Sequence, residues 1–150
     1  VNIAIRPNGG LHLFPHFSLG NTDVTMMEEA LTIIHAYNVS GRISPPRMLT
    51  KSVKKMYSLQ LTGMLRMSAF LALILPYLRT TDKRTDAILV REFCESRLAK
   101  TKKAPYSDRE LAIFQELRAR HGRSPIEILR DFTLGPGSRE KFRVKIKSGL

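Results

Sequence analysis

The chain has 150 residues, and its 43% hydrophobic content is enough for one domain with a core. Lysine and arginine number 25 against 13 acidic residues, a formal net charge of +12, which is unusual for a metabolic enzyme and favours DNA, RNA or an anionic membrane as partner. The single cysteine, Cys94, excludes an internal disulfide and a cysteine-based zinc site. We therefore expect an intracellular protein, in cytoplasm, nucleoid or organelle, that is not secreted.

No segment has the pattern of a membrane span or an export signal. The most apolar stretch, residues 67–78, is too short to cross a bilayer and is interrupted by Pro76, so it predicts a buried helix. Residues 1–6 alternate between polar and apolar and lack the positive start of a signal peptide. Because the chain opens directly in a strand pattern and without methionine, we expect it to be a fragment.

The first predicted elements are a hairpin and a helix. Residues 1–6 alternate with period two up to the turn at Pro7-Asn8-Gly9-Gly10, and residues 11–19 continue the alternation as the returning strand. Pro15 removes a ladder donor and is expected at an edge or a bulge. Asn21 to Asp23 supply capping side chains, and the apolar residues over 26–37 predict a helix of about four turns that packs on the sheet.

A second hairpin follows the helix end at Asn38 and Gly41. Its strands are predicted over residues 40–44 and 55–62, separated by a long loop over 45–52. Residues 42–55 hold five basic residues and no acidic one, so this loop is expected to touch phosphate. In the second strand Tyr57, Leu59 and Leu61 face the core, which leaves the residues between them on the opposite face.

The rest of the chain is predicted to be helical. An apolar helix runs from Gly63 through Leu75, and a further helix over 81–99 has apolar residues at spacings of three and four. Ser107 and Ser124 each precede a glutamate by three residues, the capping-box pattern, so each should begin a helix. These two helices form either a helix-turn-helix reader or a helical cap. The basic tail after Gly137 is either an added edge strand or a mobile arm.

The order strand, strand, helix, strand, strand, helix resembles the LAGLIDADG homing endonuclease family over residues 1 to about 97. The resemblance is carried by VNIAIRPN at 1–8, FSLGNTD at 17–23, YSLQLTG at 57–63, and LPYL at 75–78 followed by Lys83 and Phe93. It implies an α+β fold, a ββαββα saddle with an antiparallel sheet that lacks the family's first helix. The implied domains are a DNA-binding domain at 1–100, a helical extension at 101–134 and a basic tail at 135–150.

In the family, the sheet lies in the major groove and reads base edges, which carry a distinct donor and acceptor pattern for each base pair. The resemblance therefore implies a reading face made of Asn2, Arg6, His12, His16, Ser18, Arg42, Ser44, Ser58 and Gln60. Taken singly, each of these is also an ordinary solvated strand residue. Phosphate contacts, which position without specifying sequence, are expected from Lys51, Lys54, Lys55, Arg79 and Arg84.

Cleavage in the family uses a carboxylate at the end of the first helix, which holds magnesium, and that helix packs against its twin in a homodimer or a two-repeat chain. Since this helix is absent here, the resemblance implies Mg²⁺ only in the intact parent, no metal ligand in this chain, and a second LAGLIDADG domain as partner. Two accessory positions carry over by resemblance, Asn21 beside the attacking water and Lys83 beside the scissile phosphate. A two-residue insertion after Leu78 leaves Arg84 and Arg79 as alternatives to Lys83.

The predicted function is recognition of double-stranded DNA within a site-specific homing endonuclease, with the enzymatic activity of this chain left open. The alternative is a non-cleaving DNA-binding regulator or a maturase-like intron splicing helper on the same scaffold. Single-stranded RNA is a weaker partner, because its readers use exposed aromatic platforms and only Phe14 lies on the predicted polar face. No membrane partner is expected.

Overall fold

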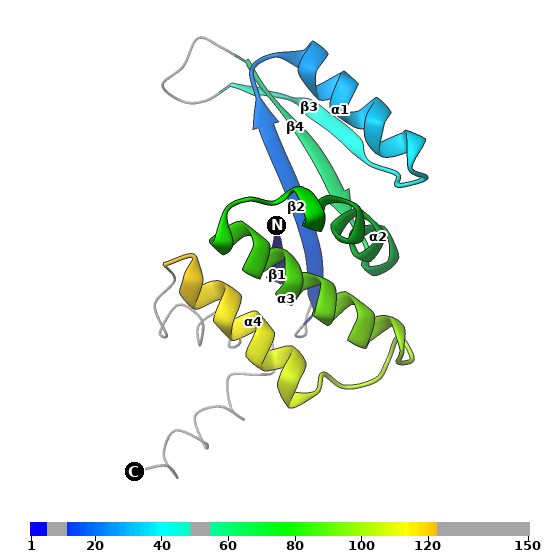
Figure 1. The fold of residues 1–150 in the computed structure, drawn as a ribbon, viewed down its shortest axis with the longest axis vertical. Coiled ribbons are helices and arrows are strands. Elements are labelled where there is room, and N and C mark those ends of the chain that lie inside the picture. Colours follow the sequence, from blue (N-terminus) through cyan, green and yellow to red (C-terminus); the bar gives the residue numbers. More distant parts are fainter. Residues whose placement is uncertain (6–11, 49–54, 123–150) are drawn as a thin grey trace. The chain divides into compact units, whose positions relative to one another are not determined.

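The computed structural model describes residues 1–5, 12–48 and 55–122. Its elements (Figure 1) are β1 Asn2–Ile5, β2 Leu13–Asn21, α1 Val24–Ala36, β3 Arg42–Met48, β4 Lys55–Thr62, α2 Met64–Ile74, the 3₁₀ helix η1 Leu75–Tyr77, α3 Thr81–Leu98 and α4 Asp108–Arg120. The strands form one four-stranded antiparallel sheet in the order β1-β2-β4-β3. This confirms the predicted α+β class and the predicted element order.

Several predicted features lie outside the described residues. These are the turn at residues 7–10, the larger part of the basic loop, the helix expected after Ser124 and the basic tail. Among the described helices, none has both the length and the apolar character that a membrane crossing needs.

The contacts divide the chain into two units. The first unit joins Val1–Asn2 to Pro15–Ala104, and the second joins Ile3–Phe14 to Pro105–Leu150. The first unit thus contains α1, β3, β4, α2, η1, α3 and most of β2, whereas the second contains α4. The domain borders predicted at residues 100 and 134 stay predictions.

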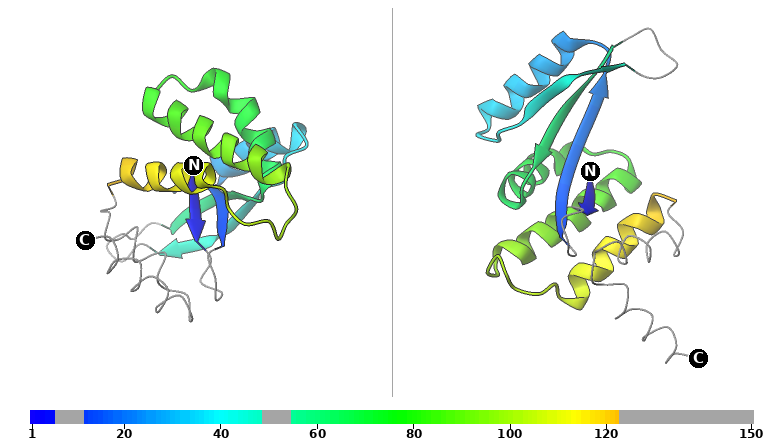
Figure 2. Two further views of the ribbon diagram at one scale, coloured as in Figure 1. Left: turned by 90° about the horizontal axis from the view of Figure 1, so that it is seen from below. Right: turned by 180° about the vertical axis from the view of Figure 1, so that it is seen from behind.

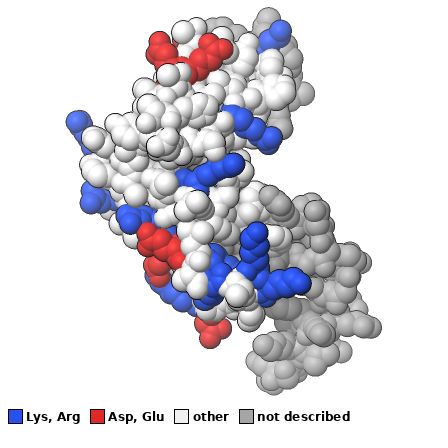
Figure 3. Space-filling view, turned by 90° about the vertical axis from the view of Figure 1, so that its right-hand side faces the viewer, with Lys and Arg blue, Asp and Glu red and all other residues white. Residues whose placement is uncertain are grey.

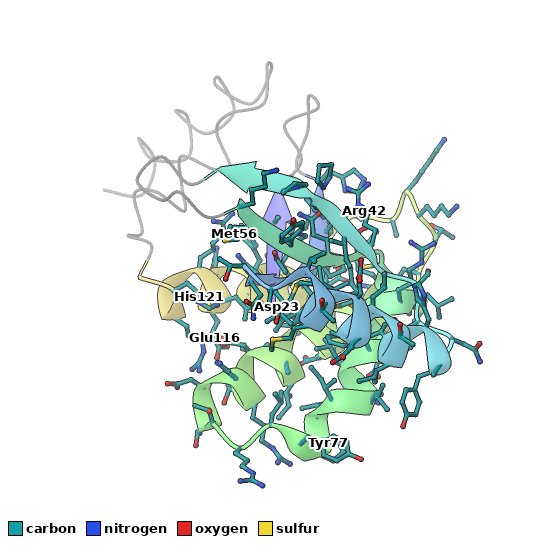
Figure 4. All side chains as sticks on the ribbon, turned by 90° about the horizontal axis from the view of Figure 1, so that it is seen from above. Asp23, Arg42, Met56, Tyr77, Glu116 and His121 are labelled. Atoms are coloured by element: carbon teal, nitrogen blue, oxygen red, sulfur yellow. The ribbon has the colours of Figure 1, made fainter. Side chains whose placement is uncertain are left out.

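One face of the sheet in the first unit is apolar. β2 and β4 pair so that Phe17 lies opposite Leu61 and Leu19 opposite Leu59, and β3 places Ile43 beside Leu59. Leu59 and Leu61 are 0% and 1% exposed. Because neighbouring side chains in a strand point to opposite faces, these residues share one side of the sheet. The helices α1, α2 and α3 lie on that side (Figures 2 and 4).

Two helices of this unit provide most of the buried apolar residues. The Phe70 ring of α2 lies 4.7 Å from the Phe17 ring, centroid to centroid, at an interplanar angle of 56°. α2 and α3 pack on each other, and both present buried side chains at spacings of three and four: Met67, Phe70 and Leu71 in α2, and Ala87, Val90, Phe93 and Cys94 in α3. Burial raises the pKa of the Cys94 thiol to about 12, so this cysteine is a core residue without nucleophilic character.

The first helix of this unit, α1, covers the sheet with one narrow stripe. The Asp23 carboxylate accepts hydrogen bonds from the backbone N–H groups of Thr25 and Met26 and so caps α1 at its start. Asn38, with a φ of 59°, follows the helix in the left-handed region, which confirms its predicted role in ending it. Only Met27 and Ile34 of α1 are buried.

The broad apolar face predicted for this helix is therefore wrong in extent. Met26, Ile33 and Tyr37 are 49%, 60% and 59% exposed. A straight helix lying on a sheet turns only one side toward it, whereas the apolar residues of this segment surround more than one side.

One prediction about prolines is also wrong. The structure places Pro45 and Pro46 inside β3, not in a loop, because the register against β4 shifts between Ser44 and Arg47 and β3 is an edge strand, where missing N–H donors are tolerated. Pro15, expected at an edge or a bulge, lies in β2, and that expectation stays a prediction. It precedes His16, the first β2 residue paired with β4, so its missing N–H removes no bond to β4.

The second unit is organised around α4. The Leu13 backbone N–H donates to the Tyr106 hydroxyl at 2.8 Å. The predicted capping box is confirmed: the Ser107 N–H donates to the Glu110 carboxylate at 2.8 Å, and the Glu110 N–H donates to the Ser107 hydroxyl at 3.4 Å. Ile113, Phe114 and Leu117 of α4 are fully buried.

Candidate nucleic-acid interface

The sheet of the first unit has a polar face opposite its apolar one. Its side chains come from three neighbouring strands, and we call this set the polar face: His16, Ser18, Arg42, Ser44, Ser58, Gln60 and Thr62. The pairing arranges them in cross-strand rows, in which His16 lies beside Thr62, Gln60 lies between Arg42 and Ser18, and Ser58 lies between Ser44 and Gly20. Figure 4 shows Arg42 on this sheet, with the helices on its other side.

Six residues of the predicted reading face are thus brought together by the pairing. Thr62 was missed, although the same alternation that selects Ser58 and Gln60 places it two residues further along β4. Each side chain of the polar face is partly or fully exposed. Hydroxyl, amide, imidazole and guanidinium groups therefore face solvent from one surface.

The centre of the polar face holds a hydroxyl pair. Ser18 Oγ and Ser58 Oγ lie 2.7 Å apart, which joins β2 to β4 by a side-chain hydrogen bond. The side chains in the row through Ser58 extend only a short way from the sheet, because Ser44 has a short side chain and Gly20 has none. The neighbouring row has two long side chains, Arg42 and Gln60. Neither forms a hydrogen bond or an ion pair with any residue that the structure describes.

His16 is the most enclosed ionisable group of this face. Burial lowers its pKa, and the positive charge of the chain's N-terminus lowers it further. The imidazole is consequently neutral at pH 7, with one nitrogen as donor and the other as acceptor. A neutral His16 contributes hydrogen-bonding capacity to the polar face without adding a charge.

The printed pairings of β2, β3 and β4 do not include the remaining predicted reading residues, whose role stays a prediction. Asn2 is a partly buried residue of β1, next to the buried Ile3. His12 is exposed, lies just before β2 and belongs to the second unit. Arg6 lies outside the described residues. The polar face defined by the pairing is therefore smaller than the predicted one.

The predicted phosphate-binding residues are only partly placed. Lys55 is exposed at the start of β4. Its position alternates with the polar-face residues of that strand, so it lies on the opposite side of the sheet from them. Arg79 is exposed between η1 and α3, and Arg84 is exposed near the start of α3. Lys51 and Lys54 lie outside the described residues. On the side drawn in Figure 3, lysine and arginine side chains lie among smaller acidic groups and do not cover one continuous area.

Asn21, expected beside an attacking water, has local partners. Its Oδ1 accepts from the Asp23 N–H at 3.1 Å, and its Nδ2 lies 3.0 Å from the sulfur of Met26. It pairs with Tyr57 and alternates with Ser18 and Gly20, so it lies on the helix-covered side of the sheet. These contacts support a role in shaping the start of α1.

Lys83, expected beside a scissile phosphate, is exposed in the first turn of α3. Burial lowers the pKa of the Val1 amino group. The nearby charges of Asp86 and Lys83 also change this pKa: the buried Asp86 raises it and Lys83 lowers it. The start of β1 and the start of α3 are therefore neighbours in the first unit. In the described part of the chain, no three His, Cys, Asp or Glu side chains are grouped as a metal site would require.

No protein-family model matches this sequence, and no curated protein matches it. Among solved structures, the fold is similar to that of the archaeal intron-encoded homing endonuclease I-Vdi141I complexed with DNA. The TM-score is 0.62 at 15% identity, and the match covers 92% of this chain and 87% of that one.

A second similar structure is the LAGLIDADG homing endonuclease I-GzeII in complex with its DNA target. The TM-score is 0.58 at 16% identity, and the match covers 87% of this chain and 43% of that one. The chain thus spans less than half the length of I-GzeII. These similarities show a shared homing endonuclease fold.

Proposed function

We propose that this chain recognises double-stranded DNA by inserting its polar face into the major groove, as part of a LAGLIDADG-type homing endonuclease. The observation that carries the proposal is the cross-strand arrangement of polar side chains on β2, β4 and β3, backed by a buried apolar face. Three strands spaced about 4.8 Å apart have outer axes about 10 Å apart. The major groove is about 12 Å wide and admits a two-stranded β-ribbon, so two neighbouring strands of the polar face can enter it together.

The chemistry of the polar face suits base edges. Arginine and glutamine side chains pair with purine edges in the major groove, and serine and threonine hydroxyls accept or donate at several bases. The excess of 25 basic over 13 acidic residues in the whole chain supports a polyanionic partner. Lys55, Arg79 and Arg84 are the described candidates for phosphate contacts, with Lys51 and Lys54 as further ones.

Phosphodiester hydrolysis with Mg²⁺ is proposed only for an intact parent protein. The described residues do not fit a magnesium site by themselves, so we assign no catalytic step to them. Lys83, near the start of β1, is the better supported accessory residue, because the Asn21 amide is engaged at the start of α1. The length of I-GzeII relative to this chain supports a second, similarly folded domain as partner, in a homodimer or a two-repeat chain.

Binding is tested by selection from a pool of random duplexes, followed by affinity measurements between 50 and 200 mM salt. We expect enrichment of a consensus sequence and a steep decrease of affinity with salt. A double variant of the polar face, Arg42→Ala with Gln60→Ala, should lose the consensus. The matched control, Thr32→Ala with Gln115→Ala, removes exposed polar groups of α1 and α4 and should keep it. A pool that shows no enrichment contradicts the proposal.

Cleavage requires a separate experiment with the chain extended upstream in its reading frame. If the extended protein cuts the selected duplex in Mg²⁺ and the present chain only binds it, the endonuclease proposal holds. If the extended protein binds the duplex and leaves it intact, the non-cleaving regulator or splicing helper replaces the endonuclease.

A further inference from the structure

The side chains of the polar face differ in length and in hydrogen bonding, and these differences bear on which bases the face selects. Arg42 of β3 and Gln60 of β4 are direct cross-strand partners and have the longest side chains of the polar face. Neither side chain has a hydrogen-bond partner among the residues that the structure describes. Their donors and acceptors are therefore available to a ligand, and no bond to another described residue has to break on binding.

The serines next to this pair have short side chains, and they already form a hydrogen bond. Ser18 and Ser58 donate and accept within their own 2.7 Å hydrogen bond, and their side chains are short. The row through Ser58 contains only Ser44 and Gly20 besides it. A base edge above this row meets only short side chains, and the Ser58 hydroxyl is already bonded to Ser18 of the neighbouring row, so the base is contacted weakly or through water.

We infer that Arg42 and Gln60 are the specificity-determining pair of this surface, with Arg42 selecting guanine and Gln60 selecting adenine at adjacent base-pair steps. The inference rests on the proposed DNA recognition. Arginine matches the two acceptors of guanine, N7 and O6, and the glutamine amide matches N7 and the amino group of adenine. The Ser18 and Ser58 hydroxyl pair is a spacer that selects no base.

The spacing of the pair agrees with neighbouring bases. The Cα atoms of directly opposed residues in an antiparallel sheet are about 4.5 to 5.5 Å apart. Successive bases along one strand of DNA are about 3.4 Å apart. Arg42 and Gln60 therefore project toward base pairs that are about one step apart, and the consensus should contain a guanine and an adenine at adjacent positions.

Arg42 has one alternative partner. It lies on the edge strand β3 and is exposed, and an arginine there is also suited to a phosphate. The two partners have different signatures. Loss of a base contact relaxes specificity at one position, whereas loss of a phosphate contact weakens binding to every sequence and reduces the salt dependence by about one unit of slope.

The test compares the consensus selected by the full chain with those selected by Arg42→Ala, Gln60→Ala, Gln60→Glu and the spacer variant Ser18→Ala. The control, Thr32→Ala, removes an exposed hydroxyl of α1 and should leave consensus and affinity unchanged. Arg42→Ala should lose discrimination at the guanine by roughly 5- to 150-fold and leave the other positions unchanged. Gln60→Ala should lose discrimination at the adjacent adenine, and Gln60→Glu should change that preference to cytosine, whose amino group donates to a carboxylate. Ser18→Ala should keep the whole consensus.

Two outcomes would overturn the inference while leaving DNA recognition intact. One is a uniform loss of affinity in Arg42→Ala with a reduced salt slope, which assigns Arg42 to phosphate. The other is a change of consensus in Ser18→Ala with none in Gln60→Ala. A wild-type chain that enriches no sequence overturns the proposed function itself. Because all four changes are on the solvent side of the sheet, equal urea midpoints confirm that the variants are folded.

Discussion

The two faces of the sheet in the first unit are built from alternate residues of the same strands, yet they carry opposite chemistry. In β4, Leu59 and Leu61 are buried under the helices, while Ser58, Gln60 and Thr62 face solvent. Burial on one face stabilises the fold, and polar groups on the other are available to a ligand. Substitutions at the solvent-facing positions of β4 can therefore change what the sheet binds, while the buried leucines between them stay the same.

The strongest test of this comparison is Leu59→Ala. Leu59 is 0% exposed, and truncating a buried leucine lowers the free energy of unfolding by about 2 to 5 kcal/mol. Urea unfolding followed by circular dichroism measures the loss. The neighbouring Ser58→Ala is the control and should cost less than 1 kcal/mol, roughly the value of one exposed cross-strand contact. Equal losses at the two positions would show that the faces do not differ in this way.

A second test concerns the helix that covers the apolar face. Asp23→Ala removes the acceptor for the Thr25 and Met26 N–H groups and should lower the free energy of unfolding by about 0.5 to 2 kcal/mol. Thermal and urea unfolding measure this loss. Asp23→Asn keeps an acceptor at the same place and should recover most of it. A loss in Asp23→Asn as large as in Asp23→Ala would assign the effect to charge.

The Ser18 and Ser58 hydrogen bond offers a smaller effect on the exposed face. A double-mutant cycle with Ser18→Ala and Ser58→Ala should give a coupling free energy of about 0.2 to 1 kcal/mol, as for other cross-strand pairs. Urea unfolding of the two single variants and the double variant supplies the four corners of the cycle. Additive single effects would mean that the two hydroxyls prefer water to each other.

His16 belongs to the polar face but is partly buried, and this burial lowers its pKa. The folded chain then binds the imidazole proton less readily than the unfolded chain. The contribution of His16 to stability is complete above the unfolded pKa of about 6.5 and is lost as the pH falls from there through the folded pKa. His16→Gln should flatten this dependence between pH 7.5 and 5. Parallel curves for the two proteins would show that other groups cause it.

The period-two alternation predicted the strands and which of their residues face solvent, because burial of one face forces that pattern on a strand. The fold class was an implication of the family resemblance. It could not predict the pairing register, which depends on contacts between distant segments. The bond between Ser18 and Ser58 joins residues 40 positions apart and has no local signal. Pro45 and Pro46 resembled a loop because the edge position of β3, which tolerates them, is a property of the whole sheet.

The same two prolines bear on how this protein behaves at high concentration. The outer edge of a sheet can pair with a strand of another molecule, and long flat edges start intermolecular aggregation in this way. β3 is the last strand in the sheet order, and Pro45 and Pro46 deprive it of two successive N–H donors where its register is already irregular. The edge therefore offers an interrupted template for pairing with a strand of a second molecule.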